Sequence, residues 1–130
     1  MANRIFLNQD NIVEAIIEGE QTYMTFDNLT MDAQALLVKL QQEGKPRLGL
    51  IDVTNQKNFT ADTNRAAMQI LESLNYDKVA IFGAKTLLTE VTKAIILAMG
   101  KTHNTKMFAD RESAMAWLKS DNPPTNLPNS

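Results

Sequence analysis

Cysteine is absent from the 130-residue chain, and histidine occurs only once. The lack of cysteine excludes disulfides, thiolate nucleophiles and cysteine-based zinc sites. A single histidine, His103, cannot form a two-histidine metal site within the chain. There is no excess of basic residues, with 13 against 15 acidic ones, which argues against a nucleic-acid binder because phosphate contacts need a basic surface. We therefore expect no metal or other cofactor and no nucleic-acid partner.

Long hydrophobic runs are also missing. The longest apolar stretch lies near residues 94–99, far short of the roughly 20 residues that span a bilayer. Near the start, the polar run from Asn8 to Asn11 interrupts any signal-peptide core. We therefore expect a cytoplasmic protein without stable membrane insertion. Hydrophobic residues nevertheless make up 44% of the chain and charged residues 22%, which is typical of a globular domain.

The composition changes only at the end of the chain. Residues 121–130 contain Pro123, Pro124 and Pro128 and almost nothing apolar. Proline fixes the backbone φ angle and removes a hydrogen-bond donor, so this segment is expected to be a flexible tail. We predict a single domain over residues 1–120, followed by the tail at 121–130.

The first part of the chain predicts a hairpin and a helix. β-Branched residues at 4–7 and 12–19 surround the polar turn, which indicates two antiparallel strands at a sheet edge. Leu29, Ala33, Leu37 and Leu40 then recur at helical spacing, and Thr30 is the expected N-cap of their helix.

Short apolar strands and amphipathic helices alternate in the rest of the chain. Buried strands are predicted at residues 48–53, 78–83 and 105–109. Helices are predicted between these strands: one begins at Thr60 or Asp62 and reaches Leu74, and another covers residues 87–99 with Leu88, Val91, Ile95 and Ala98 inward. A short final helix follows Asp110 as its N-cap and carries Ala114, Trp117 and Leu118. Strands that alternate with helices run parallel, so we predict an α/β layered domain with a mixed, mostly parallel sheet, an N-terminal antiparallel hairpin and about four helices.

This layout and three local phrases resemble the SpoIIAA-like branch of the STAS superfamily. The first two phrases are the strand Leu50-Ile51-Asp52-Val53-Thr54 and the strand Lys78-Val79-Ala80-Ile81-Phe82-Gly83. The third is the closing run from Phe108 to Leu118, which resembles the family's strand, capped turn and Trp-Leu helix. The resemblance covers about residues 4–119. It implies a STAS-like domain that works through its surface and has no catalysis of its own.

The resemblance also points to a region for recognition. Anti-sigma antagonists of this family are phosphorylated on a serine in a turn before the helix that follows the central strand. In this chain the equivalent segment, residues 58–65, contains neither serine nor glycine. Asp62 or Thr63 falls near the phosphoacceptor position.

The candidate binding residues follow the central strand and reach into the next helix. They are Asp52, Thr54, Thr60, Asp62, Thr63 and Arg65. Ligands gather beyond the carboxyl ends of parallel strands, but the turn preference of aspartate favours Asp52 as the residue that holds its own turn. The threonines could hold an anion at a helix N-terminus or simply cap the helix. Our leading hypothesis is a non-enzymatic regulatory or binding domain that recognises a protein partner here.

Two alternatives come from other features of the chain. The seven methionines and the apolar helix at 87–99 allow a carrier of a small apolar ligand or lipid. A hydrolase using Asp52 and His103 is the least favoured alternative, because no nucleophile is designated. The same helix offers Ala94, Leu97 and Ala98 as a flat surface with Ile96 exposed beside it, which suggests a possible homodimer.

Overall fold

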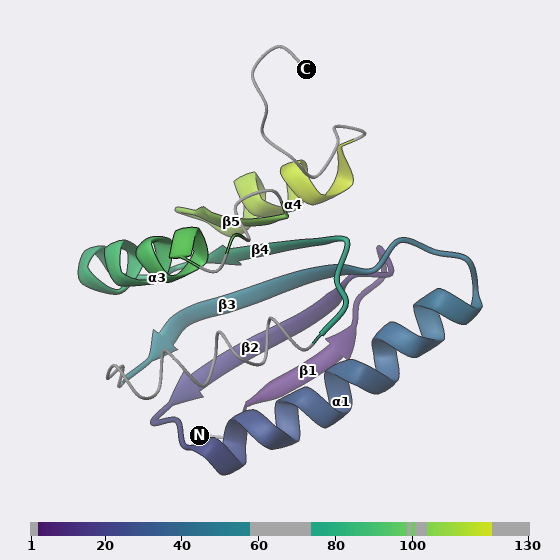
Figure 1. Cartoon of the computed structure of the whole chain (residues 1–130), viewed down its shortest axis with the longest axis horizontal. Coiled ribbons are helices and arrows are strands. Elements are labelled where there is room, and N and C mark those ends of the chain that lie inside the picture. Colours follow the sequence, from purple (N-terminus) through teal and green to yellow (C-terminus); the bar gives the residue numbers. More distant parts are fainter. Residues whose placement is uncertain (1–2, 58–73, 99, 101–103, 121–130) are drawn as a thin grey trace.

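The computed structural model describes residues 3–57, 74–98, 100 and 104–120. In this part of the chain, five strands form one sheet in the order β1-β2-β3-β4-β5 (Figure 1). The strands are β1 (Arg4–Leu7), β2 (Val13–Gly19), β3 (Leu48–Gln56), β4 (Lys78–Phe82) and β5 (Thr105–Phe108). The helices are α1 (Tyr23–Gln42), α3 (Thr86–Ala98) and α4 (Arg111–Lys119). Strand β1 is antiparallel to β2 and all other pairs are parallel, which confirms the predicted mixed sheet and its edge hairpin.

The hairpin turn is held by one side chain and one unusual backbone conformation. Asn8 Oδ1 accepts hydrogen bonds from the backbone amides of Asp10 and Ile12, at 2.8 and 3.1 Å. Asn11 has φ 59°, a left-handed conformation that asparagine adopts more readily than most residues. The polar tetrad therefore closes the turn through the Asn8 side chain and through backbone hydrogen bonds from Asn8 to Ile12 and from Asn11 to Asn8.

Helix α1 begins earlier than the sequence pattern suggested. Thr22 is its N-cap, and Thr22 and Thr25 form a reciprocal capping box. Thr30, the predicted cap, lies inside the helix and donates its hydroxyl to the Phe26 carbonyl oxygen at 2.8 Å. The spacing of the leucines did not indicate the first turn of the helix, because Phe26 is buried there instead of a leucine.

Two apolar clusters fill the opposite faces of the sheet. The first face is covered by α1 and α3 and has the larger cluster, which includes Val13, Leu37, Leu40, Val79 and Ile96. The second face carries α4 over β3, β4 and β5, and its cluster is Ile12, Leu50, Ala80, Phe82, Ala114 and Leu118. Asp110 caps α4 as predicted, and Ala114 and Leu118 are its buried residues.

Helix α3 is turned differently from the prediction. Ile96, expected to be exposed, is buried at 4% exposure, whereas Ala98, expected inward, is exposed. Thr92, one turn before Ile96, is buried with it. The buried side of α3 therefore includes a threonine. The pattern of apolar residues alone predicted a different side. The helix predicted between Thr60 or Asp62 and Leu74 falls on residues 58–73, outside the described part.

Candidate functional site

Asp52 lies within β3, because this strand continues to Gln56 and does not end at residue 53 as predicted. Asp52 Oδ1 accepts a hydrogen bond from the Thr54 amide at 2.9 Å. The ladder is irregular here: Ile16 pairs with Asp52, but Glu18 already pairs with Asn55, so β3 contains one extra residue. An extra residue is a β-bulge, and the Asp52 carboxylate binds the amide next to it.

The end of β4 packs closely against the same bulge. Gly83 follows β4 with φ 88°, and a Cβ atom at this position would overlap Thr54 Oγ1. Glycine is therefore required at position 83 both by the backbone conformation and by the close approach of Thr54. Asp52, Thr54 and Gly83 together form a tight corner near the carboxyl ends of β3 and β4, which we call the Asp52 corner.

The structure brings together two of the predicted binding residues, Asp52 and Thr54. Thr60, Asp62, Thr63 and Arg65 lie outside the described residues, as does His103 of the hydrolase alternative. The Asp52 carboxylate is engaged with its own strand through Thr54. This contact is the one expected if Asp52 holds its own turn.

A buried ion pair that the sequence reasoning missed lies beside this corner. Glu14 of β2 is 6% exposed, and its Oε1 accepts from Arg111 Nη2 at 2.9 Å and from Asn8 Nδ2 at 3.1 Å. Arg111 is the first residue of α4, and 52% of its side chain is exposed. The pair therefore joins α4 to β2 across the second face of the sheet.

The electrostatics around Arg111 are set mainly by Glu14. The hydrogen bond to Glu14 raises the pKa of Arg111, and the charges of Asp10 and Asp52 act in the same direction. Partial burial opposes this shift. Lys119 at the other end of α4 lies 3.6 Å from Asp10. Acidic groups of the hairpin and the sheet thus contact both ends of α4, and about half of the Arg111 side chain is exposed to solvent, at 52%.

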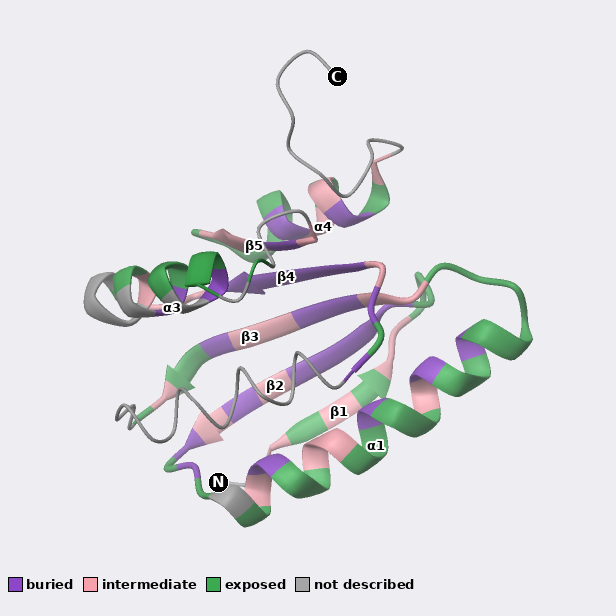
Figure 2. Cartoon of the chain, viewed as in Figure 1, coloured by how far each residue is buried: buried purple, intermediate pink, exposed green. Residues whose placement is uncertain are grey.

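Next to the pair, no helix of the described residues packs over β1 on the second face. In this part of the chain α4 packs over β3, β4 and β5, and it meets β2 only through the Arg111–Glu14 pair. Phe6 lies opposite Glu14 in the β1–β2 ladder and is 40% exposed, and Arg4 lies opposite Ile16. Residues opposite each other in a ladder share a face. We call this surface, formed by Arg4, Phe6, Ile16, Glu18 and the adjacent Arg111 around the buried Glu14, the open face; β1 shows its exposed residues in Figure 2.

The charged groups of the open face are paired within the chain. Arg4 lies 3.6 Å from Glu18, in addition to the Arg111–Glu14 pair. Glu14 and Arg111 are far apart in sequence, and only the isolated acid in a β-branched strand hinted that Glu14 needed a partner. Among residues 3–57, 74–98, 100 and 104–120, no group of three His, Cys, Asp or Glu side chains could hold a metal ion.

Within the described residues, no helix has the length and apolar character that crossing a membrane requires.

The comparisons with known proteins show the fold. No family model matches the chain, and no curated protein matches it. Among solved structures, it is similar to an uncharacterized protein of the DUF3478 family from Shewanella loihica PV-4, which is described as having a SpoIIAA-like fold. The two share 22% identity with a TM-score of 0.60, over 90% of this chain and 92% of the other. The chain therefore has a SpoIIAA-like α/β fold, which confirms the fold that the sequence resemblance implied.

Proposed function

We propose that this STAS-like domain is a non-enzymatic regulatory module that recognises a protein partner. The residues proposed for recognition are those of the open face and the Asp52 corner, together with Thr60, Asp62, Thr63 and Arg65, which follow the corner in sequence and lie outside the described residues. The observation that carries the proposal is the combination of an exposed Phe6 with a half-exposed Arg111 that is bound by Glu14, which Asn8 in turn contacts.

Aromatic and arginine side chains supply much of the binding energy at protein interfaces, especially when they are held in position before binding. Phe6 is on a β-strand and Arg111 is on the first turn of a helix, so both come from regular elements. Arginine has five donors in a planar group, and the Glu14 contact uses only part of that group. A partner with an apolar side chain beside a carboxylate fits this surface best.

The contacts of Asp52 support a positioning role. Its Oδ1 atom accepts the Thr54 amide, which ties the carboxylate to its own strand. Gly83 packs closely against Thr54, and Asp52 is near enough to Arg111 to act on its pKa. The Asp52 corner therefore lies beside the exposed arginine of the proposed surface.

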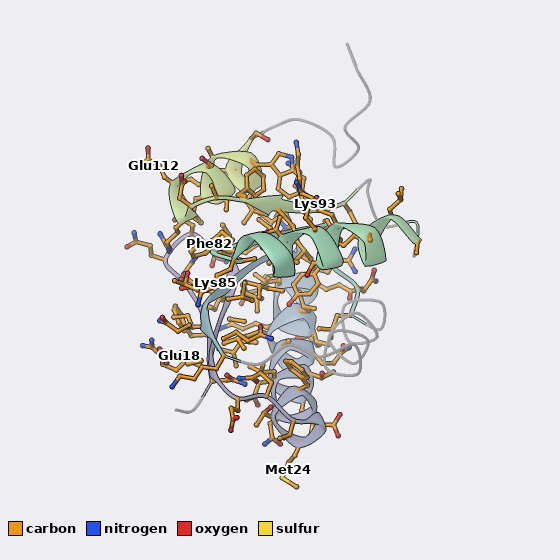
Figure 3. All side chains as sticks on the ribbon, turned by 90° about the vertical axis from the view of Figure 1, so that its left-hand side faces the viewer. Glu18, Met24, Phe82, Lys85, Lys93 and Glu112 are labelled. Carbon is orange, nitrogen blue, oxygen red and sulfur yellow. The ribbon has the colours of Figure 1, made fainter. Side chains whose placement is uncertain are left out.

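Affinity capture with the purified domain tests the proposal. The wild-type domain is expected to retain a defined partner, and Phe6→Ala and the double variant Asp62→Ala/Thr63→Ala are expected to lose it. Glu112→Ala is the matched control, because Glu112 is exposed on α4 next to Arg111 but faces no residue of the open face in the described contacts (Figure 3). Retention of every partner by both test variants would overturn the proposal.

Native mass spectrometry of the same material separates the carrier alternative. A co-purifying lipid or other small apolar molecule, present in stoichiometric amount, would favour a carrier of an apolar ligand over a protein-binding module. A mass equal to that of the bare chain supports the protein-binding module. Turnover of generic ester or phosphate substrates, lost in His103→Ala, would instead indicate a hydrolase.

A further inference from the structure

Helix α1 carries a second apolar stripe on the side away from the sheet. Met24 is 73% exposed, Met31 is 71% exposed and Val38 is 39% exposed. Each is seven residues from the next, about two helical turns, and the exposed Ala35 lies between the last two on the same side. We call Met24, Met31, Ala35 and Val38 the outer stripe. Figure 3 shows Met24 pointing away from the rest of the molecule.

The outer stripe lies opposite the residues that α1 buries. Ala33, Leu37 and Leu40 face the core, so the same helix is apolar on two sides. A surface helix that has one buried face usually has a polar outer face. Met24 and Met31 are therefore exposed apolar side chains on the side of α1 that is usually polar.

The charges of α1 identify what could cover the stripe. Asp32 and Lys39 lie on one flank of the stripe, seven residues apart, and both are exposed. The helix contains two acidic residues and one basic residue, Asp27, Asp32 and Lys39. Interfacial membrane helices are rich in lysine and arginine on their polar face, so this charge balance disfavours a lipid surface. An opposite-charge pair on one flank instead complements itself in an antiparallel copy, because a two-fold axis keeps each flank on the same side.

We propose that α1 pairs with α1 of a second copy of this chain, antiparallel across a two-fold axis close to Ala35. The small alanine side chain allows the two helices to approach at the crossing point. In this register Met31 packs against Val38 of the second copy, and Asp32 lies beside Lys39 of the second copy. Both contacts occur twice in the dimer. This dimer uses the first face of the molecule and leaves the open face free, so it does not rest on the proposed partner recognition.

Cysteine cross-linking tests the register, because the natural chain contains no cysteine. Helix axes 8–10 Å apart would bring the two Ala35 Cα atoms to about 5 Å, within disulfide range. The two Met24 residues would be about 33 Å apart along the axis. Ala35→Cys is therefore expected to form a disulfide-linked dimer under mild oxidation at low concentration, and Met24→Cys is expected to stay unlinked. Equal cross-linking of both variants, or of neither, would overturn the register.

A charge swap tests the same interface without cysteine. In sedimentation equilibrium, Asp32→Lys is expected to weaken the dimer about tenfold, because each of two ion pairs becomes a repulsion. The double variant Asp32→Lys/Lys39→Asp is expected to restore the dimer. Glu90→Lys on the exposed side of α3 is the matched control and is expected to leave the dimer unchanged.

Far-UV circular dichroism shows whether each variant is folded, and all five substituted positions are exposed. A wild-type chain that is monomeric up to its solubility limit would overturn the proposal. A dimer that is insensitive to the changes at Asp32 and Lys39, or one that Glu90→Lys disrupts, would also overturn it. None of these results bears on capture of a partner by Phe6, so the two proposals fail separately.

Discussion

The two faces of the sheet are stabilised in different ways. The first face buries a continuous apolar cluster beneath α1 and α3. On the second face, α4 covers a smaller apolar cluster and is fixed at both ends by contacts from Arg111 to Glu14 and from Lys119 to Asp10. Apolar burial is non-directional, whereas a buried carboxylate needs a specific donor. The first face therefore relies on apolar packing, and the second face adds specific charge contacts to its smaller apolar cluster.

The largest expected effect compares one buried leucine from each face. Leu40 is 0% exposed and Leu118 is 2% exposed. Leu40→Ala is expected to lower the free energy of unfolding by about 3–4 kcal/mol, because the first-face cluster cannot collapse into the cavity. Leu118→Ala is expected to cost about 2 kcal/mol, since the short α4 can shift. Urea unfolding of both variants measures the difference, and a larger loss for Leu118→Ala would reverse the ranking of the faces.

A glycine substitution tests how tightly the first face is packed. A Cβ atom at Gly49 would overlap the ring of Tyr76, which belongs to the first-face cluster. Gly49→Ala is expected to cost about 2 kcal/mol, because it overpacks the cluster. Gly44→Ala is the matched control: Gly44 has φ 70° but no neighbour within 4 Å, so only backbone strain of about 1 kcal/mol is expected. If Gly49→Ala and Gly44→Ala lose the same stability in thermal unfolding, the Tyr76 ring moves aside to accommodate the added Cβ atom.

On the second face, the ion pair should matter more than a surface pair. Arg111→Ala leaves Glu14 buried without its cation and is expected to cost about 1–2 kcal/mol, a value reduced because Arg111 is half exposed. Adding Glu14→Gln is expected to recover part of this loss in a double-mutant cycle. Arg4→Ala, which breaks the more exposed pair with Glu18, is expected to cost less than about 0.5 kcal/mol. If the stability losses of Arg111→Ala and Glu14→Gln simply add in the double variant, the two residues are not energetically coupled.

The first face also predicts a dependence on alkaline pH. Burial raises the pKa of Tyr76 well above the ordinary value of a tyrosine. The unfolded chain therefore loses this proton near pH 10 while the folded chain keeps it, so stability falls as the pH rises above 10. The loss approaches about 1.4 kcal/mol per pH unit. Tyr76→Phe is expected to remove this part of the alkaline dependence in urea titrations, and an unchanged profile would assign it to other groups.

The smallest expected effect is on the acid side and belongs to α4. The backbone hydrogen bond from Ser113 lowers the pKa of Asp110, the N-cap. The contribution of this carboxylate is present above its unfolded pKa of about 3.9 and is lost as the pH falls through the lower folded value. Asp110→Asn is expected to keep the cap and lose this pH dependence, as followed by amide exchange of α4 below pH 4. If the amide exchange of α4 depends on pH in the same way in the wild-type chain and in Asp110→Asn, the N-cap carboxylate is not the source of that dependence.

Much of the fold was predictable because its signals are local. The strand at Lys78–Phe82 is buried along its whole length, as its continuous apolar run indicated. Asp110 caps α4 as its position before the helix indicated. The end of β3 was not predictable, because the polar residues Thr54 to Gln56 gave no strand pattern and are held there by their pairing with β2. The inward turn of Ile96 depends on which side of α3 meets the sheet.

Asp52 and Thr54 of the candidate site were predicted from the sequence. The Glu14–Arg111 ion pair beside them was not. Strand endings and turn residues identify Asp52 because its partner, Thr54, is two residues away. Glu14 and Arg111 meet only because β2 and the start of α4 are brought together by the intervening sheet.

The sequence by itself determined the order of the described strands and helices and the cap of α4, because hydrophobic periodicity and capping act between residues a few positions apart. Tertiary structure alone decided that Glu14 receives Arg111, that Gly49 must yield space to Tyr76, and that one side of α1 is left apolar and uncovered. These contacts join residues that are distant in the chain, and their geometry exists only once the sheet is assembled and its helices are packed.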